Sequence, residues 1–314
     1  MKSKKLISIV TPCYNEEKNV HDHFRRISKV IRPFERKYHF EFIYTDNCSE
    51  DKTFEKLRYL AKTYKTLRVI KFSRNIGANR AIAIGLSYAK GDAAVLIQAD
   101  LQDPPELIAE FVQWWEKGFD VVYGKINKRQ ESVIMRHLRH FYYGLVTILS
   151  DVKIPLDAGE FRIMSRRVLD ALSQYDEDDI YLRGVIADIG FKQKAVSYNR
   201  SKRAKGHSSM NFFGLVGYGV NGFLSTTTVP IRLALFIGLI FSIVGFLLTL
   251  YIVGAKIIFP NKAPQGFTTL GTIVTFFAGV QMFSIGIIGE YIRKIYIQSL
   301  RRPRGFIEEK INFK

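Results

Sequence analysis

Cysteine is scarce in this sequence: Cys13 and Cys48 are the only two thiols among 314 residues. Two cysteines are too few for the disulfide framework of a small secreted domain. A signal peptide is also missing from the N-terminus, because the apolar run at 6–11 is too short for its hydrophobic region and ends at Pro12. We therefore expect the N-terminal domain to stay in the cytoplasm with both thiols reduced.

Charge is absent from two long stretches near the C-terminus. Residues 233–255 and 263–289 contain no Asp, Glu, Lys or Arg over 23 and 27 positions. About 20 apolar residues are enough for a helix to cross a hydrocarbon core of about 30 Å. Only residues 256–262 connect the two stretches. The sequence therefore predicts a hairpin of two transmembrane helices, at about 232–255 and 266–290 within residues 231–292.

Acidic residues are in the minority, with 29 against 47 Lys and Arg, for a formal net charge of +18. A basic balance suits anionic lipid, an anionic substrate or nucleic acid, and beside a membrane hairpin we favour the first two. Basic residues follow the second apolar stretch, so the positive-inside rule places both termini in the cytoplasm. We expect an integral protein of a bacterial plasma membrane, with an interfacial segment at 211–230 and a basic tail at 293–314.

The first half of the chain alternates strand patterns with helix patterns. Strands are predicted at 6–11, 40–45, 67–72, 93–97 and 120–123, and helices at 19–32, 51–64, 77–88 and 106–117. This alternation predicts an α/β domain at 1–210 with a doubly wound, mostly parallel sheet. Such sheets bind ligands at the carboxyl ends of their strands. Polar clusters follow four of these strands, at 14–16, 46–47, 74–75 and 98–103, and we expect them to form one composite site.

Three motifs follow the first, second and fourth predicted strands. They read IVTPCYNEE (9–17), YTDNCSEDKT (44–53) and QADLQDPPE (98–106), with RNIG (74–77) after the third strand. In this order they resemble the family-2 glycosyltransferases of the GT-A fold, which use a nucleotide-sugar donor. Three later segments, DAGEFRIMSR (157–166), YLRG (181–184) and YNRSKRAKGHSSM (198–210), are similar to the polyprenyl-phosphate glycosyltransferases, such as dolichol-phosphate mannose synthase and bactoprenol glucosyltransferase.

The resemblance implies a donor site and a Mg²⁺ or Mn²⁺ ion. It assigns nucleotide-sugar binding to eight residues: Pro12, Tyr14, Glu16, Asp46, Asn47, Arg74, Gln98 and Asp100. The Asp46 carboxylate could accept the imide N–H of uracil or the donors of guanine. Asp100 and Gln102 would hold the metal, which can bind through one or two carboxylates and substrate phosphates. The sequence departs from the family here, because Gln98 replaces the first Asp of the Asp-x-Asp motif.

The resemblance also implies catalytic and acceptor residues. Asp157, Arg200 and Arg203 would be catalytic, with Asp157 acting as a base, an orienter of the acceptor or a metal ligand. Arg129, Arg200 and Ser208 would bind the acceptor phosphate. Arginine binds phosphate bidentately, but a basic loop before an interfacial segment could equally bind anionic headgroups, at about 1 kcal/mol per residue. Both readings of this loop stay open.

The reaction implied is an inverting transfer of glucose from UDP-glucose to a polyprenyl phosphate. The alternatives are a polyprenyl-phosphate mannosyltransferase that uses GDP-mannose and a membrane-tethered protein that binds nucleotide or lipid without catalysis. The expected partners are the nucleotide sugar, the polyprenyl phosphate lipid and the membrane. Glycine and aromatic residues in the interfacial segment permit a homo-oligomer, and nucleic acid is not an expected partner.

Overall fold

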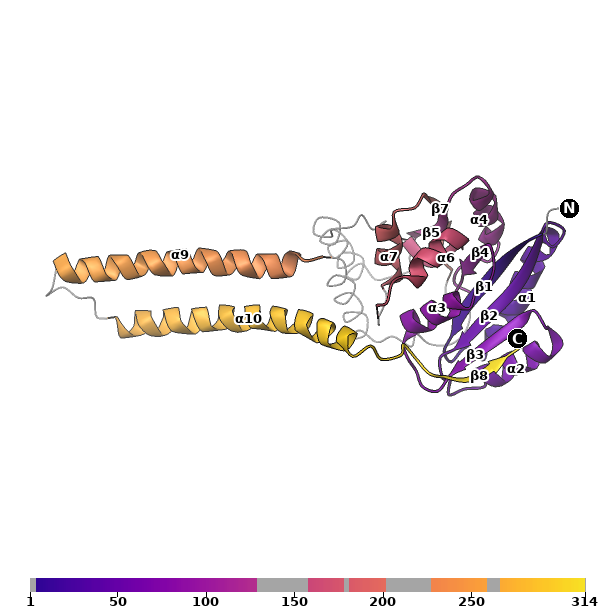
Figure 1. Ribbon diagram of the computed structural model, residues 1–314, viewed down its shortest axis with the longest axis horizontal. Coiled ribbons are helices and arrows are strands. Elements are labelled where there is room, and N and C mark those ends of the chain that lie inside the picture. Colours follow the sequence, from indigo (N-terminus) through magenta and orange to yellow (C-terminus); the bar gives the residue numbers. More distant parts are fainter. Residues whose placement is uncertain (1–3, 129–157, 178–180, 202–226, 259–265, 314) are drawn as a thin grey trace. The chain divides into compact units, whose positions relative to one another are not determined.

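The computed structural model describes residues 4–128, 158–177, 181–201, 227–258 and 266–313 (Figure 1). The chain forms two compact units. The described residues up to 201 and from 302 onward make up an α/β unit, whereas 227–301 make up a helical unit. The α/β unit is therefore built from both ends of the chain.

The α/β unit contains one sheet of eight strands, in the order β7-β5-β6-β4-β1-β2-β3-β8. The strands are β1 (Lys5–Cys13), β2 (Tyr38–Asp46), β3 (Leu67–Phe72), β4 (Ala93–Leu96), β5 (Val121–Lys128), β6 (Ala158–Ser165), β7 (Gln193–Asn199) and β8 (Ile307–Ile311). All pairs are parallel except those made by β6 and β8, which run antiparallel to their neighbours. The predicted α/β class and mostly parallel sheet are confirmed.

Helices cover both faces of this sheet. One core packs the sheet against α1 (Val20–Ile31), α2 (Thr53–Thr63) and α4 (Leu107–Glu116). The other packs it against α3 (Ala78–Ser87), α6 (Arg166–Ser173) and α7 (Leu182–Ile189). A short 3₁₀ turn, Arg32–Phe34, follows α1.

The sequence explains these layers locally. Helix α1 buries Val20, Phe24, Ile27 and Ile31, whose spacing of three or four residues keeps them on one face. Strand β4 is buried at all four positions, as expected for a parallel strand covered on both faces. Because β1 to β4 run parallel to one another, their carboxyl ends lie at the same edge of the sheet.

The C-terminal segment departs from the expectation of a basic tail at 293–314. Helix α10 (Phe267–Ser299) continues into this segment, and 307–311 form β8, which pairs antiparallel with β3. The side chain of Asn312 then donates to the carbonyls of Ala61 and Leu67 at 2.7 and 2.8 Å. Ile307, Glu309 and Ile311 are partly covered, whereas Glu308 and Lys310 between them are exposed, and such charges suit a segment that serves as an edge strand.

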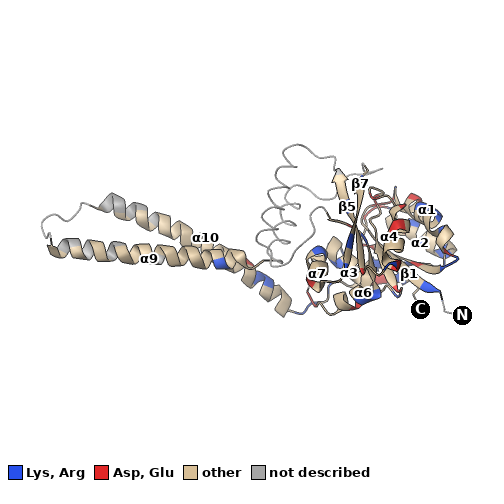
Figure 2. Ribbon diagram, turned by 90° about the horizontal axis from the view of Figure 1, so that it is seen from above, with Lys and Arg blue, Asp and Glu red and all other residues tan. Residues whose placement is uncertain are grey.

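The helical unit consists of α9 (Val229–Ile258) and α10. Figure 2 shows that most of both helices lacks charge. Within the described residues, one helix is long and apolar enough to span a membrane, at Val229–Leu247.

Candidate active site

The loops that follow β1 and β2 are tied to each other at the carboxyl edge of the sheet. The Asn15 backbone N–H donates to the Ser49 hydroxyl at 3.0 Å, and the Asn15 side chain accepts from the Glu50 N–H at 2.9 Å. Asn15 has a φ of +55°, a conformation that asparagine tolerates better than most residues. The two loops therefore form one wall of the predicted donor site.

Asp46 ends β2 in the middle of this wall and is fully buried. One carboxylate oxygen accepts the Ser49 N–H at 3.3 Å, while Oδ1 has no hydrogen-bond partner among the described residues. Burial raises the pKa of Asp46, and the Ser49 bonds and Lys71 offset only part of that shift. A buried acceptor without a donor costs free energy.

The other residues predicted to surround the nucleotide base differ in their burial and contacts. Pro12 is buried within β1, and Tyr14 is half-buried just after it. Glu16 is also buried, and its carboxylate accepts from the Asn19 side chain at 2.6 Å, just before α1. Glu16 thus has a structural role at the start of α1, whatever it contributes to the ribose pocket.

The loop after β3 joins the same edge through Asn47. The Asn47 amide donates to the Asn75 side chain at 2.9 Å, and its oxygen accepts the Ile76 N–H at 2.9 Å. Arg74 is exposed in this loop. The structure therefore brings the loops that carry Asp46, Asn47 and Arg74 together, as the composite site requires.

Gln98, Asp100 and Gln102 lie in the loop after β4. Asp100 is part-buried, and its Oδ1 accepts the Gln102 backbone N–H at 3.1 Å. Within the described residues, no three His, Cys, Asp or Glu side chains gather closely enough to hold a metal. Asp100 and Gln102 offer hard oxygen atoms, so they fit a divalent ion that shares its remaining ligands with a diphosphate.

Arg200 follows β7 and reaches the loop after β4. Its guanidinium is 3.8 Å from Asp100 and 3.1 Å from Asp103. Asp103 is almost completely buried and also accepts the Tyr198 hydroxyl at 2.5 Å. Burial raises the pKa of Asp103, and its two donors offset only part of this effect. The sequence motifs predict no role for Asp103 or Tyr198.

A second ion cluster at the start of β6 was also not predicted. Glu160 pairs with Arg183 of α7 at 2.6 Å and lies 3.6 Å from the buried Arg162. Burial alone would raise the pKa of Glu160, but the guanidinium groups outweigh it and hold that pKa below its usual value. These residues lie within the motifs at 157–166 and 181–184, and their proximity arises only from the packing of α7 on the sheet.

Several predicted features lie outside the described residues. They are the site residues Arg129, Asp157, Arg203 and Ser208, and nearly all of the interfacial segment at 211–230. Strand β6 begins at Ala158, directly after Asp157 in the sequence and at the same edge of the sheet as the carboxyl end of β4. Their assignments stay predictions.

Two protein-family models match this chain. Residues 8–173 match the family model for glycosyl transferase family 2, and residues 229–295 match the model for the GtrB C-terminal hairpin. The chain belongs to glycosyl transferase family 2.

Several relatives are similar over almost the whole chain. The uncharacterized glycosyltransferase YkcC of Bacillus subtilis is 34% identical, covering 96% of this chain and 93% of its own. The prophage bactoprenol glucosyl transferase homolog of Escherichia coli K12 is 32% identical, covering 96% and 98%. The bactoprenol glucosyl transferase of Shigella phage SfV is also 32% identical, covering 97% and 98%.

Proposed function

We propose that this glycosyltransferase transfers glucose from UDP-glucose to a polyprenyl phosphate, with inversion at the anomeric carbon. The observation that carries the proposal is the pairing, in one chain, of a composite site at the sheet edge with an apolar helical unit. Relatives named bactoprenol glucosyl transferase are similar over both parts. GDP-mannose as the donor remains the alternative within the same chemistry.

The donor would bind with its base at Asp46. The buried Oδ1 without a partner would accept an imide N–H, and the Asn15–Ser49 loops would flank the ribose. Asp100 and Gln102 would hold a Mg²⁺ or Mn²⁺ ion, which supplies charge neutralisation to the leaving diphosphate when it is bound. Gln98 provides no carboxylate, so this ion would depend strongly on the phosphates of the nucleotide.

The acceptor phosphate needs little activation by the protein. A phosphate monoester has its second pKa near about 6, so it is mostly dianionic at neutral pH. One of its oxygens would attack the anomeric carbon while the bond to the diphosphate breaks and its electron pair leaves with UDP. The protein would contribute positioning and electrostatic stabilisation, with Arg200 beside the phosphates and Asp157 orienting the acceptor.

The connectivity of the chain supports a two-helix membrane hairpin. The chain leaves the α/β unit before α9 and rejoins it after α10, where the Arg304 guanidinium donates to the Tyr175 carbonyl at 2.6 Å. A segment that starts and ends in one folded unit crosses a membrane an even number of times. Large apolar side chains stand exposed on both helices, including Leu235, Phe236, Phe283 and Ile285, and lipid would cover them.

The test incubates the purified full chain with Mg²⁺, polyprenyl phosphate and a panel of radiolabelled nucleotide sugars. We expect label from UDP-glucose to enter the lipid fraction and to depend on the lipid phosphate. Label from GDP-mannose alone would select the alternative donor. UDP binding without lipid-phase label from any donor would instead support the non-catalytic alternative and overturn the proposed reaction.

A further inference from the structure

The loop after β4 and the end of β7 contact each other across two intervening strands. We call these contacts the clamp; they join Gln102 and Asp103 to Tyr198, Arg200 and Ser201. In the sheet order, β6 and β5 separate β4 from β7, a span of about 14 Å at the usual strand spacing. Tyr198 and Arg200 nevertheless contact Asp103, and the Ser201 N–H donates to the Gln102 carbonyl at 3.0 Å. The clamp therefore passes over the carboxyl end of β5 and the start of β6.

Two glycines make room for this clamp. A Cβ atom at Gly124 of β5 would lie 2.6 Å from the Tyr198 ring, closer than real Cβ contacts allow. A Cβ at Gly159 of β6 would lie 3.3 Å from the Tyr198 hydroxyl and 3.2 Å from the Gly124 carbonyl. The absence of side chains at both positions lets Tyr198 lie across the strands and reach Asp103.

The burial of Asp103 limits what it can do. Its side chain is 3% exposed, compared with 31% for Arg200, so Asp103 faces its protein partners while Arg200 is partly open to solvent. A buried carboxylate is stabilised only when charged or hydrogen-bonded partners surround it, and Asp103 has both kinds. The same guanidinium lies 3.8 Å from Asp100, the predicted metal ligand.

We propose that Asp103 is a positioning residue that fixes the Arg200 guanidinium beside Asp100 before the donor arrives. This inference rests on the proposed function, in which Arg200 binds phosphate. An arginine already held in place loses less side-chain freedom when it binds a diphosphate. Asp103 acts through Arg200 and does not itself touch the donor.

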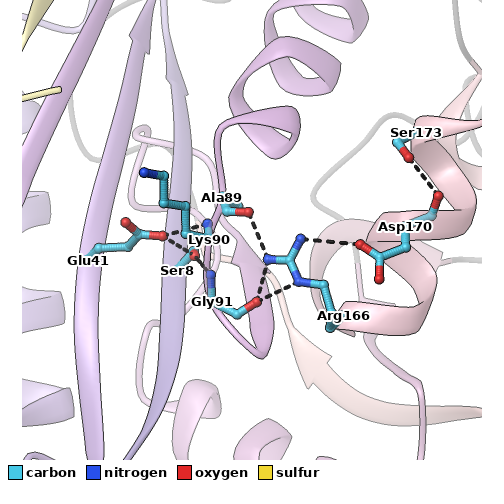
Figure 3. Close-up of polar contacts among 8 residues, drawn as sticks. All are labelled: Ser8, Glu41, Ala89, Lys90, Gly91, Arg166, Asp170 and Ser173. Carbon is cyan, nitrogen blue, oxygen red and sulfur yellow. Dashed lines mark hydrogen bonds and ion pairs between the residues drawn. The ribbon is translucent and has the colours of Figure 1, made fainter. Parts of the chain in front are cut away.

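The chain contains a matched control for loss of a buried carboxylate. Glu41, within β2, accepts from the Ser8 hydroxyl at 2.5 Å and the Lys90 N–H at 2.8 Å (Figure 3). It also pairs with Arg68 at 2.5 Å. Its partners match those of Asp103 in kind, but Glu41 precedes Asp46 by five strand residues, or about 16 Å. Glu41→Gln thus tests for instability alone.

The experiment compares Asp103→Asn, Tyr198→Phe, Gly124→Ala and Arg200→Gln with Glu41→Gln and wild type, all as the full chain in detergent. Amide hydrogen exchange without ligand reports on residues 198–201, and calorimetry with UDP and Mg²⁺ reports on the donor site. We expect Asp103→Asn and Gly124→Ala to speed exchange at 198–201 and to weaken UDP binding about tenfold. Glu41→Gln should change neither measurement, even if its melting temperature falls.

The double variant Asp103→Asn with Arg200→Gln separates positioning from general stability. Because Asp103 acts through Arg200, the double variant should bind UDP no more weakly than Arg200→Gln alone. In Asp103→Asn alone, KM for UDP-glucose should rise by a larger factor than kcat falls. Additive losses in the double variant would overturn the proposal, as would unchanged exchange at 198–201 in both Asp103→Asn and Tyr198→Phe.

The outcome is distinguishable from failure of the proposed reaction. If wild type binds UDP but transfers no sugar to lipid, the reaction is wrong, while the exchange and binding results still decide the role of Asp103. If wild type binds no UDP, donor positioning by Asp103 is overturned together with the donor site. Should Asp103→Asn fail to fold, Tyr198→Phe and Gly124→Ala test the same clamp without removing a charge.

Discussion

At the scale of single residues, Asp46 shows how a binding group can oppose stability. Its pKa is raised by burial, so the folded chain holds a proton on this carboxyl more tightly than the unfolded chain does. The ionised form therefore costs stability at neutral pH, and the cost disappears only as the pH falls through the raised pKa. A residue kept at such a cost points to binding rather than to folding.

Asp46→Asn should accordingly separate binding from stability. We expect UDP affinity to fall about ten- to a hundredfold, the range for loss of a hydrogen bond to a charged group. The melting temperature should stay unchanged or rise, because the amide oxygen can still accept the Ser49 N–H and carries no charge. Calorimetry and thermal melts check both parts. A marked drop in melting temperature with intact UDP binding would contradict this role.

His23 provides a residue-scale prediction about pH. It is fully buried against Tyr44, and burial lowers its pKa to about 3. The unfolded chain takes up a proton on His23 below about pH 6.5, whereas the folded chain does so only near pH 3. The free energy of unfolding therefore decreases as the pH falls from about 6.5 towards 3. From pH 7 to pH 5 the loss from this one group is about 2 kcal/mol.

His23→Gln should remove this part of the acid sensitivity. The variant is expected to start with a lower melting temperature but to lose less of it between pH 7 and pH 5 than wild type. Fluorescence is a suitable signal, because both tryptophans, Trp114 and Trp115, lie in α4 of the α/β unit. His21→Gln, at an exposed position, is the control and should follow the wild-type pH dependence. Parallel pH curves for all three proteins would refute the prediction.

At the scale of elements, β8 closes the edge of the sheet. It pairs with β3, and Phe313 just beyond it packs against Tyr88 with ring centroids 5.2 Å apart. Removing residues 307–314 should destabilise the α/β unit by about 3 kcal/mol, from several lost hydrogen bonds of about 1 kcal/mol each. It should also promote aggregation, because β3 becomes an exposed edge. Melting curves and light scattering would measure both effects.

A single substitution supplies the control for β8. Arg58→Gln removes the exposed ion pair with Glu309, at 2.6 Å, and the contact of the guanidinium with the Phe54 ring, and should change stability by about 1 kcal/mol or less. If the truncated chain melts like wild type and stays monodisperse, β8 is not needed to protect β3.

The elements also show how far the sequence could predict the fold. Strands β1 to β4 and helices α1 to α4 follow strong apolar patterns and were predicted within a few residues. Strand β8 reads IEEKI, and its pattern cannot be told from a charged tail unless the receiving edge of β3 is known. Strands β6 and β7 likewise depend on partners far away in the sequence.

The same limit applies to the site. Polar residues at the ends of β1 to β4 were predictable, because parallel strands bring their carboxyl ends to one edge. Asp103, Tyr198, Glu160 and Arg183 were not, since their pairing depends on tertiary packing across β5 and β6 and onto α7. Gly124 and Gly159 are the sequence feature that could have indicated this contact. Using them requires knowing that the Tyr198 ring crosses β5 and β6 at these positions.

At the scale of the whole molecule, the path of the chain constrains the number of membrane crossings more strongly than hydropathy does. Both ends of the helical unit continue into the α/β unit, whose sheet includes residues from each end of the chain. A protein with one membrane crossing would have to place β8 and β3 on opposite sides of the bilayer. Pairing of these strands therefore requires either two crossings or none, and exposed apolar side chains along α9 favour two.

Cysteine labelling in intact cells tests this topology. In a Cys48→Ser background, Lys262→Cys lies in the connection between the two apolar stretches, and Arg301→Cys lies after α10. We expect a membrane-impermeant maleimide to label Lys262→Cys from outside, whereas Arg301→Cys should react only after the cells are opened. The buried Cys13 should contribute little background. Labelling of both positions from outside, or of neither, would contradict a two-helix hairpin with both termini in the cytoplasm.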